Sequence, residues 1–599
     1  MRRDPAPGRR VTATAIGPPR AVAPCAALWL ALAAGTSPAA TPVTIAALPP
    51  EATAGRGAPV PFVEYEAENA ATNGEFLGPD RRFTTLAAEA SGRKAVRLSG
   101  RGRFVEFTLA RAANALNVRY AIPDTPDGAG RDATLGVYVG GRRIGALATT
   151  SRYGWFYGAY PFTNRPGDGS PHHFYDEARL LLGRTLPAGA SVRLMVGEVD
   201  DAPWYVVDLA DFELVAPLAA PPPNALSVLR FGADRSGLRD STSAFRRAVA
   251  AGRALRRPVW IPPGTFQVNG HLELDRVSLV GAGSWRSVLR GRGVGIYGRE
   301  APAGSRAVVL RDFAILGDVR DRDDHAALAG IGGAMGGGSR IDNLWIQHVK
   351  VGLWFDGPMD GIAIRRLRVT DTTADGLNFH RGVGHASVEE SFFRNTGDDG
   401  LAAWSGGAAD HDIVFRRNTI VAPVLANGIA LYGGRDMAVT GNLVADTLTE
   451  GGGIHVGNRF ATIPVSGRIG IAGNIVVRGG SFDPNWHFGV GALWFYALDA
   501  PLGGRIEVEA LDLVDSSEEA IQFIGKRIEG VVLNGVRIRG ASHAFQLQSP
   551  GSAAAAAIVA ADLRGPAILD CRSGFVVRQG DRNSGLGTLS RSPCLAVPQ

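Results

Sequence analysis

Short runs that alternate hydrophobic and polar residues fill the chain between residues 62 and 216. RFVEFTLA, ALNVRYAI and WYVVDLADFELV are examples, and glycine, proline or aspartate separates them. Such alternation is typical of strands that bury one face. The pattern predicts a β-sandwich over residues 62–216, followed by a proline-rich linker at 217–226.

The pattern differs after this linker. Asp240, Ser241 and Thr242 precede a short helical stretch whose apolar face carries Phe245 and Val249, and this arrangement predicts a capped helix. Beyond it, short strand-like runs continue almost to the C-terminus without another long helical period. We therefore expect a second all-β unit over residues 227–599.

A repeat of about 24 residues runs through this second unit. Glycines followed by apolar strand-like runs recur at intervals of 24, 24, 28 and 24, namely Gly352, Gly376, Gly400, Gly428 and Gly452. Ala520 and Ala544 repeat the step of 24. A period of this length with several short strands predicts a parallel β-helix, because each coil returns over the previous one. A long antiparallel sandwich, the alternative, would not keep this register.

Three asparagines follow the same repeat. Asn418, Asn442 and Asn474 lie 24 and 32 residues apart, each before an apolar run. We expect their side chains to stack and share hydrogen bonds between successive coils.

The chemistry concentrates in the stretch GDDG. Asp375 and Asp399 both precede glycine and lie 24 residues apart, so the repeat places them on adjacent coils, about 5 Å apart. Asp398 is next to Asp399. Neighbouring strand residues point to opposite faces, so the doublet requires a bend or bulge, which Gly397 and Gly400 allow.

Crowded carboxylates suit acid/base catalysis, because like charges raise one pKa and leave a proton available. A glycosidase uses one carboxylic acid and one carboxylate in this way. The alternative is a solvated turn. Residues on nearby coils could bind sugar, although some aromatic rings and histidines in such a set serve packing: Trp354, Trp404, Tyr432, Glu450, His455 and Trp494.

The charge balance argues against a nucleic-acid partner. The net charge is +6, but residues 1–40 contribute about +4 of it, from five arginines and one aspartate. This segment has an apolar core ending in small residues and predicts a signal peptide over 1–40, a linker over 41–61 and a secreted protein. A disordered tail is the alternative. No later apolar run is long enough for a membrane span, so no membrane partner is expected.

Two cysteines remain after the predicted signal, which contains Cys25. Cys571 and Cys594 could form a disulfide in an exported protein. In the cytosol they would be free thiols.

TADGLNF, RNTGDDGLAAWS and EGGGIHVGNRF resemble the motifs of glycoside hydrolase family 87, the α-1,3-glucanases and mycodextranases, over residues 225–580. The resemblance implies an inverting endo-hydrolase of α-1,3-glucan or nigeran that needs no catalytic cofactor. By analogy with polygalacturonases, Asp398 would be the general acid, and Asp375 and Asp399 would activate water. The opening FGAD and IPPGTF resembles right-handed, pectin-lyase-like β-helices and indicates fold only.

The start of the first unit, VEYEAENA, resembles a family 35 carbohydrate-binding module. The resemblance implies a structural Ca²⁺ held by Glu66 and Glu68, with Asp211 completing the site, since hard oxygen ligands suit this ion. The alternatives are exposed acids on a structural strand and a domain that only buttresses the β-helix.

Two other functions fit the fold. A polysaccharide lyase would need a basic residue beside the acids, and GDDG has no neighbouring lysine. A non-catalytic polysaccharide-binding β-helix is the third possibility, because β-helices carry many functions. The expected partner is an α-glucan, and the protein is expected to be a monomer.

Overall fold

The computed structural model describes residues 53–160, 162–587 and 589–594. The predicted signal peptide, 1–40, and the first part of the predicted linker lie outside the described residues. Of the linker, Ala58 and Val60 are buried against Phe392, so this part of the chain packs on the second unit. Within the described ranges, every helix is too short or too polar to span a lipid bilayer.

The first unit contains two antiparallel sheets, as the alternating pattern predicts. Inward-facing residues such as Phe107, Leu116 and Leu194 form its core. The larger sheet contains β3 (Glu75–Leu77), β4 (Ala95–Leu98), β13 (Tyr205–Glu213), β6 (Ala113–Ala121) and β11 (Asp176–Leu186), with β1 (Phe62–Glu66) beside β13. The smaller sheet contains β2 (Ala71–Thr72), β5 (Phe104–Thr108), β12 (Ser191–Met195), β7 (Asp132–Val139) and β8 (Arg142–Thr150). We call this unit the sandwich.

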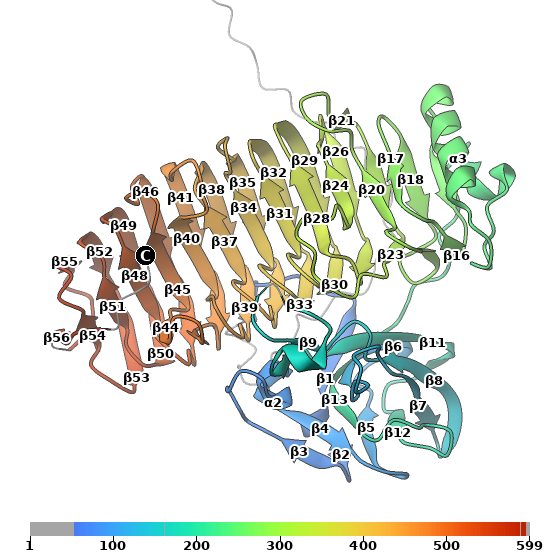
Figure 1. Cartoon of the computed structure of the whole chain (residues 1–599), viewed down its shortest axis with the longest axis horizontal. Coiled ribbons are helices and arrows are strands. Elements are labelled where there is room, and N and C mark those ends of the chain that lie inside the picture. The colour runs from blue at the N-terminus through green and yellow to red at the C-terminus, as the bar shows by residue number, and fades with distance from the viewer. Residues whose placement is uncertain (1–52, 161, 588, 595–599) are drawn as a thin grey trace, which may run out of the picture. The chain divides into compact units, whose positions relative to one another are not determined.

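The second unit is a parallel β-helix, which confirms the prediction (Figure 1). Its first sheet runs from β14 (Leu226–Ser227) to β55 (Phe575–Gln579), and its second from β16 (Gly264–Gln267) to β53 (Val559–Leu563). Its third sheet runs from β17 (His271–Glu273) to β56 (Leu589–Arg591). Successive coils add one strand to each sheet, so the hydrophobic core forms a column between the three sheets.

The repeat has a steric basis. Leu377 pairs with Leu401 one coil later, which sets Gly376 above Gly400. A Cβ atom on Gly376 would lie 2.4 Å from the carbonyl oxygen of Gly400, so only glycine fits there. The asparagine ladder also forms, since Nδ2 of Asn418 donates to Asn442 at 3.1 Å and Nδ2 of Asn442 donates to Asn474 at 3.0 Å.

A helix covers one end of the β-helix, and a disulfide ties down the chain at the other. Helix α3 (Thr242–Leu255) packs against the first strands, with Phe245 in the core. The side chain of Asp240 accepts the backbone N–H of Thr242 at 2.8 Å, which confirms the predicted cap. At the other end, a disulfide joins Cys571 to Cys594, as predicted.

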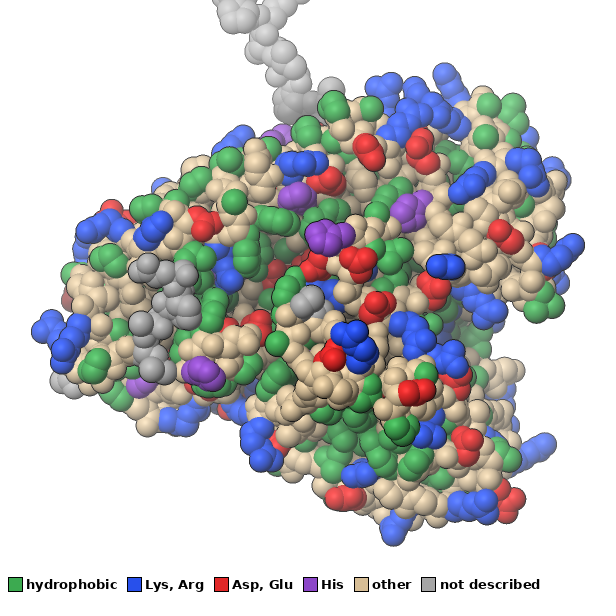
Figure 2. Space-filling view, viewed as in Figure 1, with side chains coloured by type: hydrophobic (Ala, Val, Ile, Leu, Met, Phe, Trp, Pro, Cys, Tyr) green, Lys and Arg blue, Asp and Glu red, His purple; other side chains and the backbone are tan. Residues whose placement is uncertain are grey.

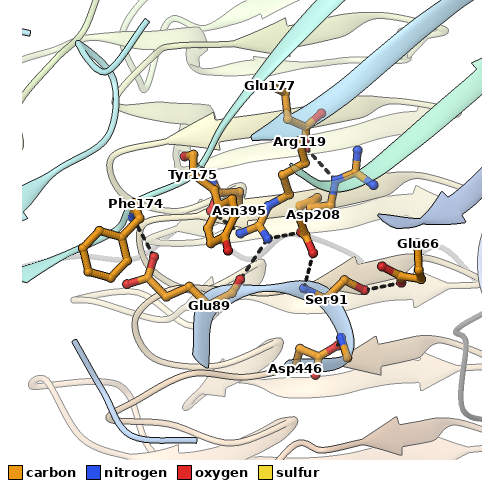
Figure 3. Close-up of polar contacts among 12 residues, drawn as sticks. Glu66, Glu89, Ser91, Arg119, Phe174, Tyr175, Glu177, Asp208, Asn395 and Asp446 are labelled. Atoms are coloured by element: carbon orange, nitrogen blue, oxygen red, sulfur yellow. Dashed lines mark hydrogen bonds and ion pairs between the residues drawn. The ribbon is translucent and has the colours of Figure 1, made fainter. Parts of the chain in front are cut away.

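The sandwich lies against the second sheet of the β-helix through buried charges. Arg394 on β33 (Phe392–Thr396) contacts carboxylates of the sandwich, and we call this group the interface cluster: Arg394, Glu64, Glu177 and Asp211. Beside it, Arg119 on β6 pairs with Asp208 and donates to Asn395 at 3.0 Å (Figure 3). The two parts belong to one compact unit.

Candidate active site

The turns that join the second sheet to the third carry the predicted aspartates. Asp375 lies between β30 (Arg368–Thr372) and β31 (Leu377–His380). Asp398 and Asp399 lie one coil later, between β33 and β34 (Leu401–Trp404). The doublet therefore lies in a turn and not on a bulged strand, because β33 ends at Thr396 and the chain changes direction there. This turn lets both side chains face the same region.

The three carboxyl groups form a close cluster, which we call the aspartate trio. Each contributes one oxygen, and these oxygens all lie within 4.8 Å of one another. Asp375 and Asp399 are buried, at 7% and 3% exposure, whereas the side chain of Asp398 is 20% exposed. A ligand would therefore meet Asp398 first.

The electrostatics of the trio favour retained protons. Burial, with the charges of Asp398 and Asp399 added, raises the pKa of Asp375 well above its ordinary value. Burial, with Asp398 beside it, raises the pKa of Asp399 to about 7. Since like charges at this distance oppose full ionisation, the trio retains a proton at near-neutral pH.

Asp399 is held by residues of the next coil. The backbone and side-chain N–H groups of Asn427 both donate to its Oδ1 at 2.8 Å, and the hydroxyl of Tyr432 donates to its Oδ2 at 2.8 Å. Asn427 is fixed in turn by the indole N–H of Trp494, at 2.8 Å from its Oδ1. This chain of contacts sets the direction of the Asp399 carboxyl.

Asp398 has different partners. Its Oδ2 accepts a hydrogen bond from Nη2 of Arg322 at 2.6 Å, and its Oδ1 accepts the backbone N–H of Asp399 at 3.0 Å. The one arginine thus pairs with the most exposed member of the trio.

Aromatic side chains beside the trio follow the register of the third sheet. His380 pairs with Trp404 on the next coil, and Trp404 with Tyr432 on the one after. Trp354 lies 6.3 Å from Trp404, ring centre to ring centre, and both are half-buried. Figure 2 shows histidine, acidic and hydrophobic side chains gathered over the middle of the β-helix. This surface offers ring faces for sugar stacking.

Two predicted sugar-contacting residues are covered by their neighbours. His455 and Trp494 are both fully buried, so neither side chain reaches the surface. His455 packs 5.1 Å from the ring of Tyr432 and 4.1 Å from that of Trp494. Tyr432 is itself 6% exposed, and its hydroxyl donates to Asp399. Glu450 is half-buried in a later turn, where burial and then Asp483 raise its pKa to about 7.

Sequence reasoning missed Asn427, Arg322, His380 and Arg459. Asn427 precedes Gly428, at the repeat position that Asp375 and Asp399 occupy on earlier coils, and this signal could have identified it. Arg459, 5.8 Å from the ring of Trp494, and His380, 4.4 Å from that of Trp404, adjoin predicted aromatics. Arg322 carries no repeat signal.

Three groups in the described part of the chain have metal-ligand geometry. One is the trio itself. A second, Asp176, His348 and Asp371, lies between the sandwich and the β-helix with its carboxylates already hydrogen-bonded. The third combines His385, His411 and Asp412 on the first sheet. None of the three includes the predicted calcium ligands.

Those predicted ligands lie at the sandwich side of the interface. Glu66 accepts the hydroxyl of Ser91 at 2.7 Å, and its Oε2, like that of Glu68, is buried without a hydrogen-bond partner among the described residues (Figure 3). Burial, then Glu64 and Asp208, raises the pKa of Glu66 well above normal. Asp211 instead pairs with Arg394 at 2.7 Å. The two orphan oxygens are of the chemical type that a hard cation binds, whereas Asp208, the nearby third acid, is already paired with Arg119 and the backbone of Ser91.

The comparisons with known proteins agree with this architecture. Residues 59–215 match the family model described as alpha-1,3-glucanase catalytic domain D1, and residues 241–544 match domain D2. No curated protein matches the chain.

Solved structures extend the similarity to both units. The catalytic unit of the thermostable GH87 alpha-1,3-glucanase from Streptomyces thermodiastaticus strain HF3-3 is 40% identical, over 89% of this chain and 98% of that one, with a TM-score of 0.82. The Agl-KA catalytic domain is 26% identical over 88% and 99%, also with a TM-score of 0.82. A GH87 alpha-1,3-glucanase catalytic domain in complex with nigerose is 24% identical over 88% and 100%, with a TM-score of 0.78. The chain therefore belongs to the α-1,3-glucanases of glycoside hydrolase family 87 and is a glycoside hydrolase that acts on α-glucan.

Proposed function

We propose that the protein is a secreted endo-α-1,3-glucanase that inverts the anomeric centre, with Asp398 as general acid and with Asp375 and Asp399 activating water. The observation that carries the proposal is the aspartate trio, in which three carboxyl oxygens lie within 4.8 Å and two side chains are buried.

Exposure supports this division of roles. Asp398 reaches the surface and can donate a proton to the glycosidic oxygen, while Asp375 and Asp399 lie behind it and can hold a water molecule between them. The water oxygen attacks the anomeric carbon, its proton passes to whichever of the two is ionised, and the bond to the leaving oxygen breaks. The products are two hydroxyl-terminated glucans, and the site regains its protons from solvent.

The short distances between the three carboxyls make the stereochemistry of the product a test of the proposed inversion. Catalytic carboxyls are roughly 6.5–9.5 Å apart in most inverting glycosidases and about 5–5.5 Å apart in retaining ones. The trio is compact, and inversion requires the water to be shared by two carboxyls and not to fill a gap. NMR of the first products from an α-linked substrate should show the β-anomer. The α-anomer would contradict inversion.

The substrate follows from the family and the surface. A relative has been crystallised with nigerose, an α-1,3-linked disaccharide. Trp354, His380 and Trp404 present rings along successive coils, which suits a polymer lying across the β-helix. We propose α-1,3-glucan as substrate, with nigeran as the second polymer to test.

The deciding experiment compares wild type with Asp398→Asn on insoluble α-1,3-glucan and on nigeran. We expect release of reducing ends as mixed oligosaccharides by wild type and a loss of roughly 10²–10⁴-fold in the variant. Asp412→Asn, on an exposed aspartate of the first sheet, is the control. Full turnover by Asp398→Asn would remove Asp398 from catalysis, and ultraviolet-absorbing products would indicate a lyase.

Export and calcium remain proposals. The disulfide between Cys571 and Cys594 supports secretion, since such bonds persist in oxidising compartments. N-terminal sequencing of exported protein would test the proposed signal peptide, and light scattering the expected monomer. For calcium, Glu66, Glu68 and Asp208 or Asp211 would be the ligands, and thermal melting with Ca²⁺ against EDTA tests binding. Equal melting temperatures would contradict it.

A further inference from the structure

A turn of an earlier coil reaches the aspartate trio. Residues 317–328 join β23 (Ala314–Leu316) to β24 (Ala329–Gly333), and Arg322 in this turn has a side chain that is only 8% exposed. Its Nη2 donates to Asp398 at 2.6 Å and its Nη1 to the carbonyl of Gly397 at 3.4 Å. Its Nε donates to Asp324 at 2.9 Å, within the same turn. The guanidinium therefore joins this turn to the one that carries the doublet.

The sandwich holds the same turn from the other side. The hydroxyl of Tyr160 donates to Oδ2 of Asp324, and the ring of Tyr160 lies 5.0 Å from the guanidinium carbon of Arg322. Asn164 donates to the carbonyl of Arg320 at 3.0 Å. The sandwich thus contacts Arg322 by a ring face and fixes its hydrogen-bond partner.

We propose that Tyr160 and Asp324 hold Arg322 as a positioning residue for Asp398, so that the sandwich helps to set the geometry and charge of the catalytic acid. The inference rests on the proposed role of Asp398.

Both carboxylate oxygens of Asp398 accept a hydrogen bond. Oδ2 accepts from Arg322 and Oδ1 from the backbone of Asp399, which fixes the plane of the carboxyl group. A displacement of about 1 Å in a catalytic group can cost roughly 100-fold in rate. Arg322 is thus placed to keep Asp398 aimed while the substrate binds.

The positive charge of Arg322 offsets the repulsion between Asp398 and the acidic groups around it. The charged or titratable groups that face Asp398 or Arg322 from all neighbouring elements are Asp375, Asp399, Glu450, Tyr432, Tyr160, Asp324 and Lys350. Most of these groups are acidic, and Arg322 is the one cation that donates to Asp398 among the described residues. Without the guanidinium, Asp398 would face these acids with no cation donating to it.

The first test is the pH dependence of kcat/KM for Arg322→Met on soluble α-1,3-linked gluco-oligosaccharides. We expect kcat to fall about 100-fold with KM within about threefold of wild type. We also expect the alkaline limb to move upward by about one pH unit, because an acid that stays protonated works at higher pH. Arg322→Lys should recover part of kcat and return the limb toward wild type.

Arg368→Met is the matched control. Arg368 is another buried arginine on the β-helix that binds a sandwich carboxylate, Glu213, at 2.9 Å and lies over aromatic rings. Within the described part of the chain it makes no contact with the trio, so its loss should lower the melting temperature and leave both limbs in place. Matching changes in both variants would overturn the proposal in favour of a structural role.

Tyr160→Phe keeps the test valid if Arg322→Met does not fold. Tyr160 is 51% exposed, so removing its hydroxyl should leave folding intact. We expect a three- to tenfold fall in kcat and a shift of the same limb, because Asp324 and then Arg322 lose support. Wild-type kcat and limbs in both Tyr160→Phe and Arg322→Lys would overturn the proposal.

The outcomes separate the two levels of inference. If Asp398→Asn is inactive and the Arg322 and Tyr160 variants resemble wild type, only the positioning role is wrong. If the acidic limb moves instead of the alkaline one, Arg322 positions Asp398 as proposed, but Asp398 is the base and the division of roles is reversed. If Asp398→Asn is fully active, both proposals are wrong.

Discussion

Two groups of three carboxyls with one arginine meet on β33 and the turn that follows it, and they differ in which carboxyls the arginine pairs with. In the interface cluster, Arg394 gives Nη1 to Glu64 at 2.9 Å, Nε to Glu177 at 2.6 Å and Nη2 to Asp211 at 2.7 Å. All four side chains are at most 3% exposed. In the aspartate trio, Arg322 binds only Asp398, and that side chain reaches solvent.

The comparison shows that the distribution of the arginine charge distinguishes a cluster that stabilises the structure from one that can exchange protons. Arg394 divides its charge over three acids and is enclosed by them, so the cluster ties β33 to the sandwich. Arg322 leaves Asp375 and Asp399 without a cation, and their pKa values rise through burial and mutual repulsion. Three carboxyls and one arginine therefore join the sandwich to the β-helix in the interface cluster, whereas in the aspartate trio they retain a proton.

The largest expected effect is on the interface cluster. Arg394→Met leaves three buried carboxyls without their cation, and removing one partner of a buried ion pair costs about 3–5 kcal/mol. Urea unfolding should show this loss. Arg416→Met, which breaks an exposed pair with Glu389, should cost at most about 1 kcal/mol. Equal losses would mean that burial does not distinguish the interface cluster.

The next effect has the opposite sign. Burial, then Asp398, raises the pKa of Asp399 from 3.8 to about 7, so the stability that it contributes below pH 3.8 is lost as pH rises to 7. Asp399→Asn does not titrate, so at roughly 1.4 kcal/mol per pKa unit it should gain about 4 kcal/mol over wild type at pH 7.5 and nothing at pH 3.5. Melting at the two pH values tests this gain, which should accompany loss of activity.

Asp446→Asn sharpens the same comparison. Burial raises the pKa of Asp446, but Arg478 at 2.6 Å and Arg93 outweigh it, and the net shift is downward. The stability from Asp446 is therefore present above pH 3.8 and lost as pH falls. The variant should be less stable than wild type at pH 7.5, opposite to Asp399→Asn. Shifts of the same sign would contradict our reading of the two sites.

A smaller effect is expected at Tyr432. Tyr432→Phe removes the hydroxyl that donates to Asp399 at 2.8 Å, and a hydrogen bond to a charged group contributes about 1.5–3 kcal/mol. We expect kcat to fall about tenfold or more, with little change in KM. An unchanged kcat would show that Asn427 alone orients Asp399.

The smallest effect concerns the sugar surface. Trp404→Ala removes a half-buried ring beside Trp354 and His380, and one ring contact is worth about 1 kcal/mol. KM for oligosaccharides should rise roughly fivefold while kcat changes little. Phe76→Ala, at an exposed ring of the sandwich, is the control and should leave KM unchanged.

Much of the fold could be predicted because it repeats. Gly376 and Gly400 recur where a Cβ has no room, and Asn418 recurs as Asn442 where an amide ladder needs it, so the 24-residue step is visible in the sequence. The same step brings Asp375 beside Asp399. Local geometry was less accessible, since the sequence left a bend and a bulge open for the doublet, and the structure has the bend, after the end of β33.

The partners of the trio were harder to predict because they are distant in the chain. Arg322 lies 76 residues before Asp398, in a turn without the repeat motif, and Tyr160 belongs to the other unit. The burial of two side chains could not be predicted from the alternating pattern either. His455 and Trp494 occupy outward-facing register positions but are covered by neighbouring side chains. Contacts set by docking of two units leave no periodic trace in the sequence.

The helix that covers the first coil affects whether two β-helices can associate end to end. In a parallel stack each coil offers its open backbone edge to the next, so an uncovered terminal coil would be a template for end-to-end growth into fibres. Helix α3 places Phe245 over the first coil, and the disulfide from Cys571 to Cys594 ties down the last strands. The covering helix therefore hinders growth at the first end of the stack.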